Sequence, residues 1–312
     1  MTQRQTDIET PGAALAELRS AWKTFGSGGA AVHAVQSVDL QVRPGELLAV
    51  LGPNGAGKTT ALGMLTGLSA PTGGTARLFG RDPRDRAARQ RMGVMLQSSG
   101  VPDTLRVREL LTAFRGYYPC PLPVASVVQA AGLHALENRM FGTLSGGQQR
   151  RVLFGIALCG NPDLVFVDEP TTGLDAEVRR TLWATLRDLA GPGRGVVLTT
   201  HYLDEADALA DRIVVMNQGR VIAEGTPAQI KSRVSGRRIS ADSSITAEQA
   251  SGWDGVHHAQ RDGTRLELLV SEPEPVLREL LHRDRSVTAV TVTEPTLEDA
   301  FLTLTEHTEE AA

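Results

Sequence analysis

Residues 52–60, Gly-Pro-Asn-Gly-Ala-Gly-Lys-Thr-Thr, decide the fold that the rest of this 312-residue chain must adopt. The stretch matches the phosphate-loop pattern G-x-x-x-x-G-K-[ST]. Residues 47–51 form an apolar run that leads directly into the loop and is typical of a buried parallel strand. Residues 58–68 leave the loop with good helix formers. A glycine-rich turn could match by chance, but strand, loop and helix in this order indicate a phosphate-binding α/β core.

The loop supplies the groups that a bound triphosphate needs. Its glycines allow backbone N–H groups to turn inward, and the N-terminus of the following helix adds a partial positive charge. Lys58 is expected to reach the β- and γ-phosphates, and the Thr59 hydroxyl is expected to ligate Mg²⁺. The nucleotide contacts predicted in this loop are Gly52, Pro53, Asn54, Gly55, Ala56, Gly57, Lys58, Thr59 and Thr60.

The composition excludes several classes of protein. A hydrophobic fraction of 41% is ordinary for a globular chain, and the length favours one large domain with a smaller one. The net charge of −4 argues against a nucleic-acid surface, which normally shows a basic excess. Cys120 and Cys159 are the only cysteines, so neither a disulfide framework nor a zinc site is expected.

The sequence shows no sign of membrane insertion or secretion. No apolar stretch approaches the roughly 18 residues that a spanning helix needs. The N-terminus lacks a basic region followed by an apolar one, which is the mark of a secretory signal. We therefore expect a cytoplasmic protein, unless another subunit holds it at a membrane.

Patterns along the chain predict a disordered N-terminus and two domains. Residues 1–13 are polar and expected to be disordered. Residues 14–235 are expected to form the nucleotide-binding domain, with a helical subdomain inserted at about 98–160. The pattern changes near 236, and residues 236–312 combine weak strands with helices, which predicts a small α+β accessory domain.

Two kinds of sheet are expected in the larger domain. Residues 14–25 and 32–42 alternate apolar and polar residues, as half-exposed antiparallel strands do. Apolar runs at 164–167 and 196–200 flank a helical pattern at 176–190, and this βαβ unit predicts a parallel sheet. The predicted fold class is thus an α/β phosphate-loop core with an antiparallel β subdomain and a helical subdomain.

Asp168 and Glu169 directly follow the apolar run at 164–167. A phosphate loop needs a carboxylate that holds magnesium and, for hydrolysis, a group that positions water. Asp168 is the candidate Mg²⁺ ligand, and Glu169 is the candidate general base. The alternative is that the pair is only the polar end of a strand.

His201 and residues 144–148 are further candidates. His201 follows the strand predicted at 196–200, at the edge where ligands bind in parallel sheets, and could be either a cap or a catalytic group. Residues 144–148 read Leu-Ser-Gly-Gly-Gln, in which Ser145 can cap a helix whose first amides are bared by the two glycines. This predicts a second anion site, with an ordinary capped helix as the alternative.

Taken together, these motifs resemble the ATP-binding subunit of an ABC transporter. They are GPNGAGKTT at 52–60, Gln97, LSGGQ at 144–148, LVFVDE at 164–169, GLD at 173–175 and His201. LSGGQ is close to unique to that superfamily. The resemblance implies an ABC ATPase that binds ATP with Mg²⁺, hydrolyses it and pairs head to tail with a second such subunit, as a homodimer or with a close relative.

The resemblance also implies roles for individual residues. Each ATP would lie between the phosphate loop of one subunit and the LSGGQ helix of the other. Gln97 would contact magnesium and water and sense the membrane partner, His201 would hold the γ-phosphate, and Asp175 would lie in the loop that communicates between the two sites. The catalytic set is then Glu169, His201 and Gln97, the metal set is Thr59, Gln97 and Asp168, and the nucleotide contacts outside the loop include Ser145, Gly146, Gly147, Gln148 and Asp175.

Phe25 is the candidate for stacking on adenine. The family places an aromatic residue ahead of the first strand, and phenylalanine keeps the stacking face. The alternative is that Trp22 and Phe25 are both part of the sheet core. No Asn-Lys-x-Asp element is present to read guanine, so ATP is the expected nucleotide.

A finer resemblance concerns the class of transporter. Residues 199–206, TTHYLDEA, and residues 295–305, PTLEDAFLTLT, are similar to the daunorubicin-resistance type of ABC exporter. That class implies a separately encoded membrane permease, export of a drug or another small hydrophobic molecule, and a peripheral position on the cytoplasmic side of the cell membrane.

Two other functions fit the sequence less well. A non-transport ABC ATPase acting on ribosomes or DNA usually carries two ATP units or a long coiled-coil insertion, whereas this chain has one unit, no heptad run and a mildly acidic charge. A nucleotide-binding regulator without turnover is disfavoured because Glu169 is present.

Overall fold

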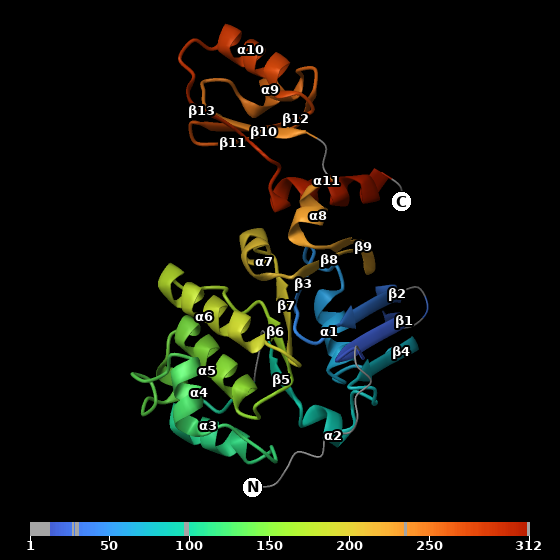
Figure 1. The fold of residues 1–312 in the computed structure, drawn as a ribbon, viewed down its shortest axis with the longest axis vertical. Helices are drawn as coiled ribbons and strands as arrows, with labels where there is room; N and C mark the ends of the chain where they lie inside the picture. Colours follow the sequence, from blue (N-terminus) through green and yellow to red (C-terminus); the bar gives the residue numbers. More distant parts are fainter. Residues whose placement is uncertain (1–12, 27, 29–30, 97–99, 234–235, 311–312) are drawn as a thin grey trace. The chain divides into compact units, whose positions relative to one another are not determined.

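The computed structural model describes residues 13–26, 28, 31–96, 100–233 and 236–310, which form two compact units (Figure 1). The first unit ends at Glu224 and the second begins at Gly225. The division precedes the boundary expected near 235–236, because helix α8 (Pro227–Lys231) packs against helix α11 (Leu297–Glu310) in the second unit.

A six-stranded sheet forms the centre of the first unit. Four of its strands are buried at every residue, as in a parallel sheet that is covered on both faces. Its register pairs Leu51 with Thr200 and Asp168 with Thr199, so the strands that precede the predicted site residues end at one edge. The strand order is β5 (Met92–Met95), β6 (Leu164–Asp168), β7 (Gly195–Thr200), β3 (Leu47–Leu51), β8 (Arg212–Asn217) and β9 (Arg220–Gly225).

An antiparallel sheet and helix α1 (Lys58–Leu65) cover one face of the central sheet. The antiparallel sheet has the order β2 (Val32–Val42), β1 (Ala16–Phe25) and β4 (Gly73–Leu78). Its buried side chains share one core with those of α1 and with the alternate residues Leu48, Val50 and Phe166 of the central strands. The predicted α/β core with an antiparallel β subdomain is therefore confirmed.

Helices cover the other face of the central sheet. In Figure 1, α5 and α6 lie on the opposite side of the strands from α1. The described part of the region expected to be a helical subdomain contains three α-helices, and the last of them, α5, packs against strands β5 and β6. Besides α1, the described helices of this unit are α2 (Arg86–Arg89), α3 (Val107–Arg115), α4 (Val124–Ala130), the 3₁₀ turn η2 (Phe141–Thr143), α5 (Gly146–Leu158), α6 (Ala176–Leu189) and α7 (Leu203–Leu209).

The second unit is an antiparallel sheet with helices and its own core. Ile239, Trp253, Leu268 and Leu280 are among its buried side chains. The strand order is β11 (Val256–Asp262), β12 (Arg265–Val270), β10 (Arg237–Asp242) and β13 (Thr288–Thr293), and the other helices are α9 (Ala247–Ser251) and α10 (Pro273–Arg283). The sequence did not predict β10, β11 or α9.

Neither cysteine forms a disulfide. Cys120 is exposed and Cys159 is buried, and both thiols are free. Burial raises the pKa of the Cys159 thiol to about 12, so it behaves as a small apolar group. Among the described residues, no helix is long and apolar enough to cross a bilayer.

Arg238 on β10 ties helix α11 to the sheet of the second unit. Its guanidinium donates to Asp299 Oδ1 at 2.8 Å and to the Glu267 carboxylate. Burial opposes the positive charge of Arg238, but the two carboxylates outweigh it and raise the pKa. Asp299 also accepts a hydrogen bond from the Thr296 backbone N–H at 2.7 Å, at the start of the helix.

We expect Asp299→Ala to destabilise the second unit by about 2–4 kcal/mol, because it leaves the partly buried Arg238 guanidinium short of a partner. Native-state hydrogen exchange of the β10 amides measures this directly. Glu298→Ala changes the adjacent exposed carboxylate and should shift the same exchange by less than about 0.5 kcal/mol. Equal effects of the two substitutions would contradict the role of the buried pair.

Candidate functional site

The phosphate loop connects β3 to α1 at the edge of the sheet where the parallel strands end. Gly57 has φ 96°, and a Cβ there would lie 2.4 Å from the Ala34 carbonyl oxygen of β2. A Cβ at Gly52 would lie 2.4 Å from the Met216 carbonyl oxygen of β8. Side chains are excluded at both glycines, because the loop backbone packs directly against two neighbouring strands.

Lys58 lies inside the curve of the loop. Its side chain is 6% exposed, and Nζ donates to the Gly52 oxygen at 2.6 Å and the Pro53 oxygen at 3.0 Å. Burial lowers the pKa of the ammonium, while the charges of Glu169 and Asp168 act in the opposite direction. The structure thus places a desolvated cation beside two anions, and phosphate oxygens are stronger acceptors for it than backbone carbonyls.

Asp168 and Thr59 present oxygen atoms to each other across the end of β6. The Thr59 hydroxyl donates to Asp168 Oδ2 at 3.4 Å, and Asp168 Oδ1 accepts a hydrogen bond from the Thr199 hydroxyl. A hydroxyl beside a carboxylate fits Mg²⁺, which takes oxygen ligands and completes its shell with substrate phosphates and water. Among the described residues, no cluster of three His, Cys, Asp or Glu could hold a metal by itself.

Glu169 and His201 meet at the ends of β6 and β7. His201 Nδ1 lies 3.1 Å from Glu169 Oε1. Glu169 has φ 49°, a left-handed conformation that costs a non-glycine residue roughly 1–3 kcal/mol. Its N–H donates to the Thr199 oxygen at 3.0 Å, and its carbonyl accepts from Arg150 of α5. The surrounding contacts therefore hold the carboxylate in a strained but defined position.

The predicted second anion site lies at the N-terminus of α5. Ser145 and Gln148 form a reciprocal capping box, in which the Ser145 hydroxyl accepts from the Gln148 N–H. A hollow of about 410 Å³ lies beside this helix end, between residues 145–148 and the loop 172–175. Asp175 in that loop caps α6 through the Val178 N–H at 2.9 Å.

The predicted site residues fall into two groups in this chain. One contains Lys58, Thr59, Asp168, Glu169 and His201, and the other contains Ser145, Gly146, Gly147, Gln148 and Asp175. Gln97 lies outside the described residues.

Phe25 is 47% exposed at the end of β1, with Lys23 Nζ 5.1 Å from its ring centre. Trp22 is 41% exposed and lies against Gly73. Neither ring is buried, so the alternative that both belong to the sheet core is wrong. An open aromatic face is what stacking on a base requires.

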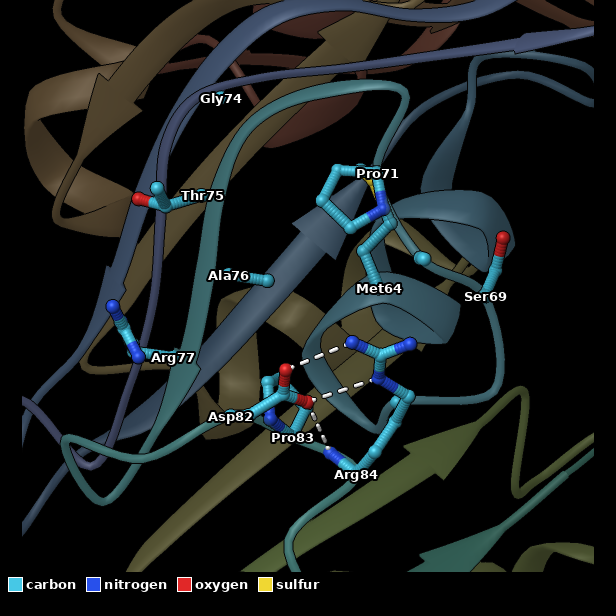
Figure 2. A pocket seen from close by; sticks show the side chains of 12 residues that line it. Met64, Ser69, Pro71, Gly74, Thr75, Ala76, Arg77, Asp82, Pro83 and Arg84 are labelled. Atoms are coloured by element: carbon cyan, nitrogen blue, oxygen red, sulfur yellow. Dashed lines mark hydrogen bonds and ion pairs between the residues drawn. The ribbon is translucent and has the colours of Figure 1, made fainter.

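A second hollow in this unit contains none of the predicted residues. It lies at the C-terminal end of α1 and is lined by residues such as Met64, Pro71 and Arg77 (Figure 2). Figure 2 shows Arg84 turned onto Asp82, with an ion pair of 2.9 Å, and this partner lowers the pKa of Asp82 to about 2. The phosphate loop is at the other end of the helix.

Some residues that shape the site were not predicted. Thr199 orients Asp168, and Arg150 binds the Glu169 carbonyl. Glu205 on α7 is 1% exposed and accepts hydrogen bonds from Thr171 and Trp183. Burial raises the pKa of the Glu205 carboxyl, and these bonds offset the rise only in part. The sequence motif TTHYLDEA contained Glu205 but gave no sign of its burial.

Comparisons with known proteins agree on one family. Residues 35–172 match the family model described as ABC transporter. The chain is 38% identical over 303 residues to the daunorubicin/doxorubicin resistance ATP-binding protein DrrA of Streptomyces peucetius, covering 90% of this chain and 92% of that protein. It is also 38% identical over 290 residues to the Nod factor export ATP-binding protein I of Burkholderia orbicola (strain AU 1054), covering 87% and 91%.

Solved structures give the same result. A dimeric ATP-binding cassette in a post-hydrolysis state with ADP and Pi matches with a TM-score of 0.62 and 27% identity, over 68% of this chain and 98% of that one. The structure of an ATP-binding subunit of an ABC transporter matches with a TM-score of 0.63 and 25% identity, over 70% and 92%.

We expect Lys58→Ala to weaken ATP binding about 10- to 100-fold, because it removes charge-assisted hydrogen bonds to phosphate. Titration calorimetry of the full chain measures the affinity. Lys231→Ala in α8 of the second unit is the matched control and should bind as the unsubstituted chain does. Unchanged affinity in Lys58→Ala would contradict the placement of Lys58 at the phosphates.

Proposed function

Because the chain belongs to the ATP-binding subunits of ABC transporters, we propose that its hydrolysis of ATP powers a separate membrane permease that exports a drug or another small hydrophobic molecule. Full-length similarity to a drug-resistance subunit and to a Nod factor export subunit supports export. The comparisons do not favour action on ribosomes or DNA. The observation that supports the proposed mechanism is the 3.1 Å contact between Glu169 and His201, at the same edge of the sheet as the phosphate loop.

In the proposed reaction, Glu169 is the general base. It takes the proton of the water that attacks the γ-phosphate, while His201 holds that phosphate and Lys58 offsets its charge. Thr59 and Asp168 would hold Mg²⁺, which neutralises charge on the β- and γ-phosphates when bound. Gln97 is proposed to contact the metal and the water, and Phe25 to stack on adenine.

The second group of residues is proposed to act on the nucleotide of a second copy. The N-terminus of α5 offers the backbone amides of Gly146 and Gly147 next to the capping serine Ser145, and such a helix end suits an anion. Residues 145–148 would cover the phosphate loop of the partner, and Asp175 would lie between the two sites. The dimeric cassettes among the structural relatives support the pairing of two subunits, and the head-to-tail orientation is part of the proposal.

The partner and the location follow from the same proposal. A chain without a described spanning helix needs a membrane subunit to move a solute, so we place it peripherally on the cytoplasmic face. Co-expression with a candidate permease tests this. We expect the two proteins to co-purify and the permease to stimulate ATP hydrolysis. A chain that reaches full activity and binds no membrane protein would contradict the proposed coupling.

We expect Glu169→Gln to keep ATP affinity but lower kcat by at least about 100-fold, because the amide cannot accept the proton. ATP should then trap a dimer that size-exclusion chromatography with light scattering detects. Glu177→Gln, at an exposed position of α6, is the control and should hydrolyse ATP normally. Hydrolysis near the control rate in Glu169→Gln would show that another group is the base.

A further inference from the structure

Glu205 is a buried carboxylate that the proposed reaction does not use. It lies on the inner face of α7, beside the apolar residues Ala206 and Leu209. Its Oε1 accepts from Trp183 Nε1 at 2.9 Å, its Oε2 accepts from the Thr171 hydroxyl at 3.3 Å, and the Thr200 side chain is a third hydrogen-bond partner.

These three partners belong to three different segments of the site. Thr171 is in the loop that begins with Glu169 and ends with Asp175. Thr200 ends β7 and directly precedes His201 in the chain, and its hydroxyl accepts a hydrogen bond from the Tyr202 N–H at 2.9 Å. Trp183 lies on α6, which Asp175 caps. Glu205 is therefore hydrogen-bonded to the segments that carry Glu169 and His201, whose side chains meet at 3.1 Å.

Packing alone does not explain a carboxylate at this position. Burying a carboxylate is unfavourable unless hydrogen bonds replace its hydration, so an apolar residue would fill the same volume more easily. The donors converge on Glu205 from outside its own helix, and none of them comes from α7. The arrangement links three segments that are distant in sequence through one side chain.

We propose that Glu205 is a positioning residue for ATP hydrolysis. Its hydrogen bonds fix the loop 169–175 relative to the end of β7. Glu169 in that loop thereby keeps its left-handed backbone conformation and its contact with His201. This rests on the roles proposed for Glu169 and His201. Glu205 itself contacts neither nucleotide nor water in the proposed mechanism.

Glu205→Met tests the proposal, because it keeps the size of the side chain and removes its acceptors. We expect kcat of the full chain to fall about 10- to 100-fold, as small displacements of catalytic groups cause. KM for ATP should change less than about threefold, since the phosphate loop is untouched. Glu205→Gln keeps an acceptor for Trp183 and a polar group for Thr171, and should restore kcat to within about fivefold.

A structural role would give a different result. Leu209→Ala removes buried packing from the same helix and should lower the melting temperature with kcat within about twofold of the unsubstituted chain. Thr171→Val removes one donor and should not add to Glu205→Met in the double variant, because both break the same bond.

Two outcomes would overturn the positioning role. One is a normal kcat in Glu205→Met. The other is an equal loss of kcat in Leu209→Ala when the two variants have the same melting temperature. Neither outcome is the same as failure of the proposed function. That failure would instead appear as ATP hydrolysis at a near-normal rate in Glu169→Gln.

Discussion

The parallel pairing of β3, β6 and β7 is the constraint on which the site depends. Parallel strands end at the same edge, and the register of these three leaves the phosphate loop, Glu169 and His201 side by side there. The strands can pair in this way because they are apolar at nearly every position and both sheet faces are covered. The core thus sets the site geometry before any catalytic side chain is considered.

Threonine hydroxyls hold the acidic groups that this geometry collects. Thr199 donates to Asp168, and Thr171 and Thr200 bind Glu205. A hydroxyl satisfies a buried carboxylate without cancelling its charge, as an arginine or lysine would do. Asp168 therefore stays available to a cation and Glu205 stays fixed. Lys58 is a cation that the charges of Glu169 and Asp168 act on, and its burial shields it from water.

Local motifs were predictable from the sequence, and long-range contacts were not. The phosphate loop, the strands around it and the fold class follow from short patterns. Strand β10 was not predictable in this way, because Arg238 and Ser240 make its sequence polar. Their side-chain hydrogen-bond partners are Glu267, Thr296 and Asp299, which come from elsewhere in the chain. Glu205 was missed for a similar reason: glutamate on a short helix is normally solvated, and its partners are distant in sequence.

The bond from Arg150 to the Glu169 carbonyl gives helix α5 two functions at once. The first turn of this helix carries the serine and glycines proposed to bind a partner's nucleotide, and Arg150 in the next turn holds the backbone of Glu169, the proposed base of its own site. Ser145 and Arg150 lie within the first two turns of one helix, so a ligand bound at Ser145 would change the free energy of the contact that holds Glu169. Thermodynamic linkage makes that effect equal in both directions. In a head-to-tail pair, nucleotide binding in one subunit's site would then be coupled through α5 of its partner to the position of Glu169 in the partner's own site.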